Sequence, residues 1–221
     1  NYINKGRKIK VFKNYFNYKD FQKSFLDKKA KIITSCAMFY DIAEPIKFVK
    51  DIDKMLHKNG IWCVQISYLA SMINFNNFYD ICHEHLSYYS IETFEKLLSS
   101  FNLKCFYAET NGVNGGSIRL YISRKDSKIF QKKSYIKNIN QLKKVEKKMN
   151  LTNPNTLKKF QKTIDNIKSK TNKFVNKINT SNEKIFALGA STKGNILLQH
   201  FGLDKSRIPF ISERNPEKVG L

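Results

Sequence analysis

The sequence predicts an α/β fold in which part of a doubly wound sheet is followed by part of a second α/β unit. Apolar, β-branched runs alternate with segments of helical period from residue 31 to residue 101. Two further strand-like runs, joined by a glycine-rich turn, then predict an antiparallel hairpin that closes the sheet. The chain has 221 residues, 41% of them hydrophobic, which is enough for one large domain or two small ones.

Local signals place the elements of the first unit. Pro45 is typical of the first position of a helix, and Asn59-Gly60 is predicted to end that helix with a left-handed residue. Residues 70–89 have no clean period and are predicted to form a long functional loop with at most one helical turn. Ser90 is a predicted N-cap for a helix over residues 91–100. The predicted strands occupy residues 8–12, 31–37, 61–69, 103–108 and 117–123.

A second unit is predicted beyond a lysine-rich stretch, which we expect to be a mobile or helical linker. Apolar residues from Leu157 to Ile178 recur every three or four positions and predict an amphipathic helix. The following order is strand, turn, helix and strand, over residues 184–188, 189–195, 196–201 and 208–211. The predicted division is residues 1–124, a linker over residues 125–155, and residues 156–221.

The formal charge of +22 raises the question of nucleic-acid binding. Seventeen lysines and four acidic residues fall between Lys125 and Lys184, and the lysines are interleaved with Asn, Ser, Thr and Ile. This pattern favours solvated helix faces over a nucleic-acid surface, so nucleic acid is the less favoured partner.

The sequence also predicts a cytoplasmic location. No run approaches the roughly 20 apolar residues of a membrane helix, and the first ten residues are polar and basic, unlike a signal peptide. Four cysteines occur without a C-x-x-C pair, which favours reduced thiols over a disulfide framework or a zinc ribbon. The sequence predicts no oligomeric state.

The densest group of reactive side chains lies between Tyr79 and His85. A histidine near neutral pKa can take or give a proton, and an adjacent acid such as Glu84 can orient its ring. His83, His85 and Cys82 supply part of a metal site, but no second pair of His or Cys stands out to complete it. Three interpretations stay open at this point: a general base, a metal site, and structural hydrogen bonding.

Two further segments contain candidate anion-binding residues. Gly189 to Asn195 (GASTKGN) lies between a predicted strand and helix, where backbone amides can approach an anion and Lys193 adds positive charge. A simple tight turn explains the same glycines. Arg119, after the glycine turn, can reach an anion or lie on a strand surface, and Glu213 is either a ribose-binding acid or a surface charge.

Three segments in this order resemble the deoxysugar C-methyltransferase family: YDICHEHLSYYS, NGVNGGSIRLY and GASTKGNILLQ. The resemblance extends over nearly the whole chain. It implies the second half of a Rossmann-like class I methyltransferase domain, followed by part of a second Rossmann-like domain. It also implies S-adenosylmethionine as cofactor and a nucleotide-linked 4-keto-deoxysugar as substrate. The family's zinc module and glycine-rich cofactor loop are expected outside this chain, so no metal is expected in it and the chain alone is expected to be inactive.

The resemblance assigns roles to particular residues. His85 is implied as the general base that removes a proton from carbon, and the alternatives are O- or N-methyl transfer in the same fold and a non-catalytic remnant. The implied catalytic, substrate-binding and cofactor-binding residues are, respectively, His85, Glu84 and His83; Tyr79, Asn114, Arg119 and Lys193; and Cys36, Ala37, Met38 and Phe39.

Overall fold

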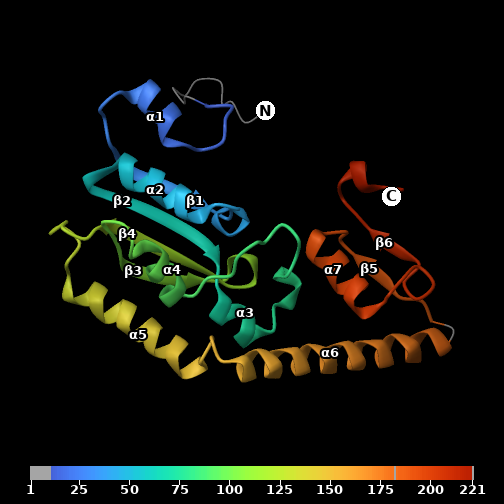
Figure 1. The fold of residues 1–221 in the computed structure, drawn as a ribbon. Coiled ribbons are helices and arrows are strands. Elements are labelled where there is room, and N and C mark those ends of the chain that lie inside the picture. Colours follow the sequence, from blue (N-terminus) through green and yellow to red (C-terminus); the bar gives the residue numbers. More distant parts are fainter. Residues whose placement is uncertain (1–10, 182, 221) are drawn as a thin grey trace.

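The computed structural model describes residues 11–181 and 183–220 and shows two α/β units beside each other above a long helix (Figure 1). The first unit and its following helix contain α1 (Tyr18–Phe25), β1 (Ala30–Cys36), α2 (Pro45–Met55), β2 (Leu56–Ser67), α3 (Leu69–Phe75), α4 (Ile91–Leu98), β3 (Leu103–Asn111), β4 (Ser117–Arg124) and α5 (Lys133–Met149). The remainder contains α6 (Pro154–Thr180), β5 (Phe186–Leu188), α7 (Thr192–Phe201) and β6 (Phe210–Ser212). Short 3-10 helices include η1 (Phe39–Asp41), η2 (Phe78–Asp80) and η3 (Val113–Gly115).

The larger sheet has the strand order β1-β2-β4-β3. β1 and β2 are parallel, whereas β4 runs antiparallel to both β2 and β3. The structure thus confirms a mixed α/β fold with the predicted hairpin, and the finer Rossmann-like assignment stays a prediction. Most of the predicted strand over residues 8–12 lies outside the described residues, and its last two residues belong to no strand.

The predicted left-handed stop at Asn59-Gly60 is wrong. α2 begins at Pro45 as predicted but ends before Leu56, whose φ of −69° and ψ of 129° lead directly into β2. Neither Asn59 nor Gly60 has a positive φ. A Cβ on Gly60 would lie 2.9 Å from the carbonyl oxygen of Ala30, so the glycine permits β2 to pass close to β1.

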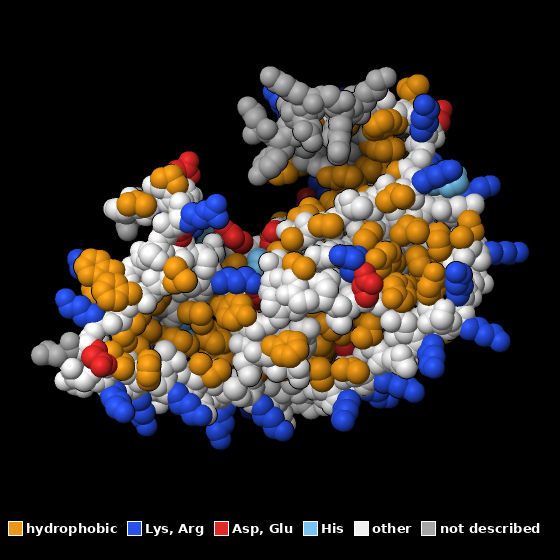
Figure 2. All heavy atoms as spheres, turned by 180° about the vertical axis from the view of Figure 1, so that it is seen from behind, with side chains coloured by type: hydrophobic (Ala, Val, Ile, Leu, Met, Phe, Trp, Pro, Cys, Tyr) orange, Lys and Arg blue, Asp and Glu red, His pale blue; other side chains and the backbone are white. Residues whose placement is uncertain are grey.

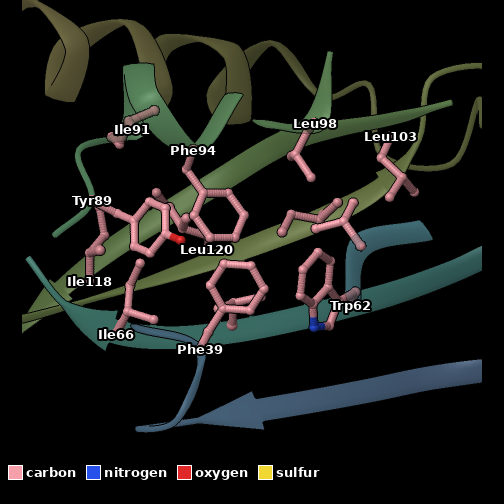
Figure 3. Close-up of a cluster of buried hydrophobic side chains, with 14 of the residues drawn as sticks. Phe39, Trp62, Ile66, Tyr89, Ile91, Phe94, Leu98, Leu103, Ile118 and Leu120 are labelled. Carbon is pink, nitrogen blue, oxygen red and sulfur yellow. The ribbon is translucent and has the colours of Figure 1, made fainter. Parts of the chain in front are cut away.

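An aromatic cluster fills the space between the sheet and the helices α2 and α4 (Figure 3). Phe39 is completely buried, and its ring centroid lies 5.2 Å from that of Phe94 and 5.7 Å from that of Trp62. The Trp62 indole N–H donates to the Ser35 hydroxyl over 3.0 Å, so its polar atom is satisfied within the core. Ser90 caps α4 as predicted, through a reciprocal capping box with Thr93.

Two helical segments differ from the sequence prediction, and a third decides between its alternatives. α1 was not predicted, and α3 with η2 occupies part of the segment predicted as a loop. The lysine-rich stretch contains α5, so the helical alternative for the linker is the one observed. Ile139 and Leu151 join the main core, and Glu146 of α5 is 4% exposed. α5 is therefore packed against the first unit.

The second unit consists of α7 and the parallel pair β5-β6. It meets the first unit through a small apolar cluster made by Met72, Phe78, Phe160, Ile164 and Phe201. α6 is the predicted amphipathic helix, capped by the Asn153 side chain. None of the helices in the described part of the chain is both long and apolar enough to cross a membrane.

Candidate functional site

The loop that contains His85 is attached to the segment that follows β1. The backbone carbonyl of Tyr40 accepts hydrogen bonds from the amides of Leu86 and Ser87 over 2.9 and 3.1 Å. The Tyr40 ring also contacts the His85 ring edge-on, with 4.4 Å between centroids. The carboxyl end of β1 and the loop beyond β2 therefore lie together, as the α/β topology predicts.

His85 is held in a defined orientation. Its Nδ1 atom lies 2.7 Å from the backbone carbonyl oxygen of Asp80. Because a carbonyl can only accept, Nδ1 carries the proton in the neutral ring and Nε2 retains a free lone pair. The side chain is half-buried. This arrangement suits a group that accepts a proton at Nε2.

Asp41 is a charged neighbour of this histidine that the sequence interpretation missed. Partial burial raises the pKa of Asp41, the nearby His85 lowers it, and Glu84 raises it again. The three side chains are therefore close enough to interact electrostatically. One feature of the sequence could have indicated Asp41: it lies in the short turn that directly follows a predicted buried strand.

His83 and Glu84 differ from His85 in their surroundings. Both are exposed, and within the described residues the His83 ring makes no hydrogen bond. His83 and Cys82 instead line a cavity of about 500 Å³ whose other wall is α7, including Thr192 and His200. Among residues 11–181 and 183–220, no group of three or more His, Cys, Asp and Glu side chains is placed to hold a metal.

Three of the four predicted substrate-binding residues meet around one ammonium group. Lys193 Nζ lies 3.0 Å from the carbonyl oxygen of Asn114 and 5.2 Å from the centre of the Tyr79 ring. It also lies 2.5 Å from Oδ1 of Asp80, a residue that was not predicted as part of the site. The contacts join η2, the hairpin turn and α7.

Arg119 is placed elsewhere. Its guanidinium lies 2.7 Å from Oε1 of Glu109 and 2.7 Å from Oε1 of Gln65, both on neighbouring strands of the large sheet. The hydrogen bond to Tyr121 is the largest cause of a raised Arg119 pKa. The structure thus pairs Arg119 within the sheet and does not bring it to Lys193.

The hairpin turn depends on glycine for close packing. Asn114 has a φ of 55° within η3. A Cβ on the following Gly116, whose φ is 132°, would lie 2.6 Å from the Ser71 Cβ of α3. The Asn77 amide donates to the Gly115 carbonyl and accepts from the Tyr79 hydroxyl. These contacts place the Asn114 carbonyl beside η2.

The glycine turn before α7 is a helix cap with an acid beside it. Ser191 caps α7 by accepting from the amide of Gly194 over 3.0 Å. The carboxylate of Glu213 accepts hydrogen bonds from the backbone amides of Asn215, Ala190 and Arg214, and these hydrogen bonds lower its pKa. Glu213 therefore ties the loop after β5 to the loop after β6.

The predicted cofactor-binding segment divides into accessible and buried parts. Cys36 is exposed and Met38 is half-buried, whereas the Phe39 side chain lies in the core and reaches no surface. Ala37 adopts a φ of 52°, a left-handed conformation that is strained for a residue with a Cβ. Residues 36–38 thus present backbone and uncharged side chains at the carboxyl end of β1.

The chain is similar to known C-methyltransferases. Residues 112–221 match the family described as the C-methyltransferase C-terminal domain. C-methyltransferase NovU of Streptomyces niveus is 25% identical over 191 residues, which are 86% of this chain and 44% of that protein. The chain therefore spans less than half the length of this relative. A solved structure titled "A Pericyclic Reaction enzyme" aligns with a TM-score of 0.36 and 12% identity, over 44% of this chain and 27% of that one. That structural similarity is too low to support an argument.

Proposed function

We propose that this protein methylates carbon, because residues 112–221 match the C-methyltransferase C-terminal domain family. The methyl donor is S-adenosylmethionine, and the acceptor is a carbon next to the ketone of a nucleotide-linked 4-keto-deoxysugar. The sugar assignment is supported by the resemblance of three segments, around His85, Asn114 and Lys193, to deoxysugar C-methyltransferases.

The observation that carries the mechanism is the hydrogen bond from His85 Nδ1 to the Asp80 carbonyl, 2.7 Å long. It leaves Nε2 as the proton acceptor. A ketone makes the neighbouring C–H acidic because the charge left on carbon spreads onto oxygen. His85 removes that proton, and a positioned base of this kind contributes about 10²–10⁴-fold to the rate.

Two neighbours prepare His85 for this step. The Tyr40 ring, 4.4 Å away, restricts rotation of the imidazole and covers one edge of it. Asp41 lies close enough to His85 to interact with it electrostatically. His85 thus accepts the proton without a change of orientation.

Residues 36–38 are proposed to hold S-adenosylmethionine. Cys36 and Met38 are accessible at the carboxyl end of β1, and the loop of His85 is attached to the residues that follow them. When bound, S-adenosylmethionine supplies an activated methyl group. The Phe39 side chain, which is buried in the core, anchors the end of this segment.

We propose a cytoplasmic location from the thiols. All four cysteines, Cys36, Cys63, Cys82 and Cys105, are free. Free thiols are typical of a reducing compartment.

The test uses the complete gene product and a keto-sugar nucleotide in heavy water, followed by NMR. His85→Gln preserves size and some hydrogen bonding but cannot accept the proton. We expect it to lower both deuterium exchange next to the ketone and formation of the methylated sugar, by about 10²–10⁴-fold. The matched control, His83→Gln, changes an exposed histidine of the same loop and is expected to have a milder effect.

Two outcomes would contradict the proposal. Exchange at the wild-type rate in His85→Gln would assign the base to Glu84, His83 or Tyr79. A product of the unaltered protein whose new methyl group is bonded to oxygen or nitrogen, as its NMR chemical shift reports, would indicate the alternative methyl transfer.

A further inference from the structure

Lys193 is the point at which the second α/β unit meets the loop of the proposed base. It is the second residue of α7, and its side chain crosses to the first unit. The Nζ atom lies 2.5 Å from Oδ1 of Asp80, in an ionic contact without the geometry of a directed hydrogen bond. The same atom donates to the Asn114 carbonyl over 3.0 Å and lies over the Tyr79 ring. The ammonium is thus already neutralised and partnered on several sides.

Asp80 gives this contact its importance. Its side chain is only 3% exposed, whereas that of Lys193 is 36% exposed. A buried carboxylate is costly without a counter-charge, and within the described residues Lys193 is the one cation that forms a salt bridge with it. The backbone carbonyl of Asp80 also accepts from His85 Nδ1 over 2.7 Å and from the Tyr88 hydroxyl over 3.3 Å. A single residue therefore pairs with α7 and orients His85.

The opposite end of α7 is attached to the same 3-10 helix. Phe201, the last residue of α7, packs against Phe78 of η2 with 5.8 Å between ring centroids. α7 therefore rests on η2 through an apolar contact at one end and an ion pair at the other. The cavity of about 500 Å³ lies between α7 and residues 81–83, so both contacts determine its width.

We propose that Lys193 and Asp80 form a clasp that positions α7 over the loop and keeps the Asp80 carbonyl in place for His85 Nδ1. Lys193 is then a positioning residue, and its charge serves Asp80 and not a phosphate of the substrate. This changes the role expected for Lys193 from the sequence. The importance of the clasp for catalysis rests on the proposed function of His85, but its geometry does not.

The test measures the histidine tautomer by NMR of ¹⁵N-histidine-labelled protein, without substrate, using His85→Gln to assign the signals. Lys193→Met preserves the length of the side chain and removes its charge. We expect this variant to replace the single Nδ1-protonated form of His85 by a mixture of tautomers. Asp80→Asn combined with Lys193→Met removes both charges, so we expect the double variant to recover the wild-type tautomer. Lys205→Met, an exposed lysine of the same unit, is the matched control and should leave the His85 signals unchanged.

The same variants are titrated with inorganic pyrophosphate to test the phosphate role directly. With Lys193 engaged by Asp80, Lys193→Met should bind pyrophosphate as Lys205→Met does. A loss of about tenfold or more, the effect of one missing charge-assisted hydrogen bond, together with an unaltered His85 tautomer would overturn the proposal. So would a double variant whose His85 tautomers are as mixed as those of Lys193→Met alone.

Different assays test the clasp and the proposed base, so the failure of one can be told from the failure of the other. If His85→Gln retains proton exchange while Lys193→Met alters the tautomer, the clasp stands and the catalytic assignment does not. If the tautomer is unaltered while His85→Gln abolishes exchange, the catalytic assignment stands and the clasp does not.

Discussion

The two α/β units share an order of strand, helix and strand, but only the first encloses a core. In β2, Trp62 and Val64 are completely buried between the sheet and its helices. β5 and β6 contain no buried residue, and the side chains of Phe186 and Leu188 are 65% and 90% exposed. A parallel pair of short strands cannot cover its own faces. The second unit therefore depends on its contacts with α6 and with η2.

Exposed hydrophobic side chains, in contrast, occur on the surfaces of both units. Figure 2 shows hydrophobic side chains gathered on the side of the four-stranded sheet that is seen from behind, and basic side chains along the edge where α5 and α6 run. Exposed apolar residues include Ile32 of β1 and Phe210 of β6. The lysines of the two long helices mostly point to solvent, as the sequence pattern predicted.

The same substitution in both units gives the largest expected contrast. Phe39→Ala removes a completely buried ring from the first core and should lower the free energy of unfolding by about 3–5 kcal/mol. Phe186→Ala in β5 removes an exposed ring and should change it by less than about 0.5 kcal/mol. Urea denaturation followed by circular dichroism measures both. Equal losses would show that β5 is buried in solution and would remove the contrast between the units.

A smaller effect is expected at the junction of α5 and the first unit. The buried Glu146 carboxylate accepts from the Tyr68 hydroxyl over 2.8 Å and from the Ile91 amide at the start of α4 over 2.7 Å. Glu146→Ala leaves both donors unsatisfied and should cost about 1–3 kcal/mol of unfolding free energy. The control is Glu217→Ala, which changes an exposed acid near the C-terminal end of the chain. A cost no greater than that of the control would show that α5 is a detachable linker.

The smallest expected effect is on the chemical reactivity of the cysteine thiols. It involves little change in the free energy of unfolding near neutral pH. Burial raises the pKa of the Cys105 thiol to about 12, whereas Cys36 is exposed. Because the thiolate is the reactive form, a thiol reagent at pH 8 should modify Cys36 first and Cys105 last. Mass spectrometry of the peptides measures the order. Early modification of Cys105 would contradict a closed sheet.

The raised pKa of Cys105 also predicts a pH dependence. Below the unfolded thiol pKa of about 8.5, both states are neutral and the contribution of burial is complete. As the pH rises from there toward the folded pKa of about 12, the unfolded thiol ionises first, so the folded state loses stability. Cys105→Ala should remove this part of the alkaline loss in denaturation experiments, and an identical slope in both proteins would refute it.

Elements with strong local signals were predictable from the sequence. Pro45 at the start of α2, Ser90 as the N-cap of α4 and the apolar period of α6 depend on neighbouring residues, and the structure confirms all three. α3 was not predictable as a full helix because its seven residues lack a helical polar period and its start has no side-chain cap. Its Ala70 and Met72 are buried against other parts of the chain, so tertiary packing forms it.

The candidate site, like the fold, was predictable only in part. The family resemblance grouped Tyr79, Asn114, Arg119 and Lys193 as substrate-binding residues, and the structure brings all of them except Arg119 together. Asp80 as the partner of Lys193 was not predictable, because the ion pair joins two units that are distant in sequence. The paired state of Arg119 was equally hidden, since it depends on the register that places Gln65 and Glu109 on either side of it.

α6 is a long arm that joins the two units. Its 27 residues span about 40 Å, and it begins at the short joint after Asn150, whose φ is 52°. Near its far end, Asn172 donates to the Phe201 carbonyl and accepts from Arg207, so the second unit is attached to this arm. A tilt of about 10° at the joint would displace the far end by about 7 Å. The apolar cluster of Phe160 and Ile164 with Met72 and Phe78 opposes such a tilt, so a stiff α6 holds α7 in place beside the cavity.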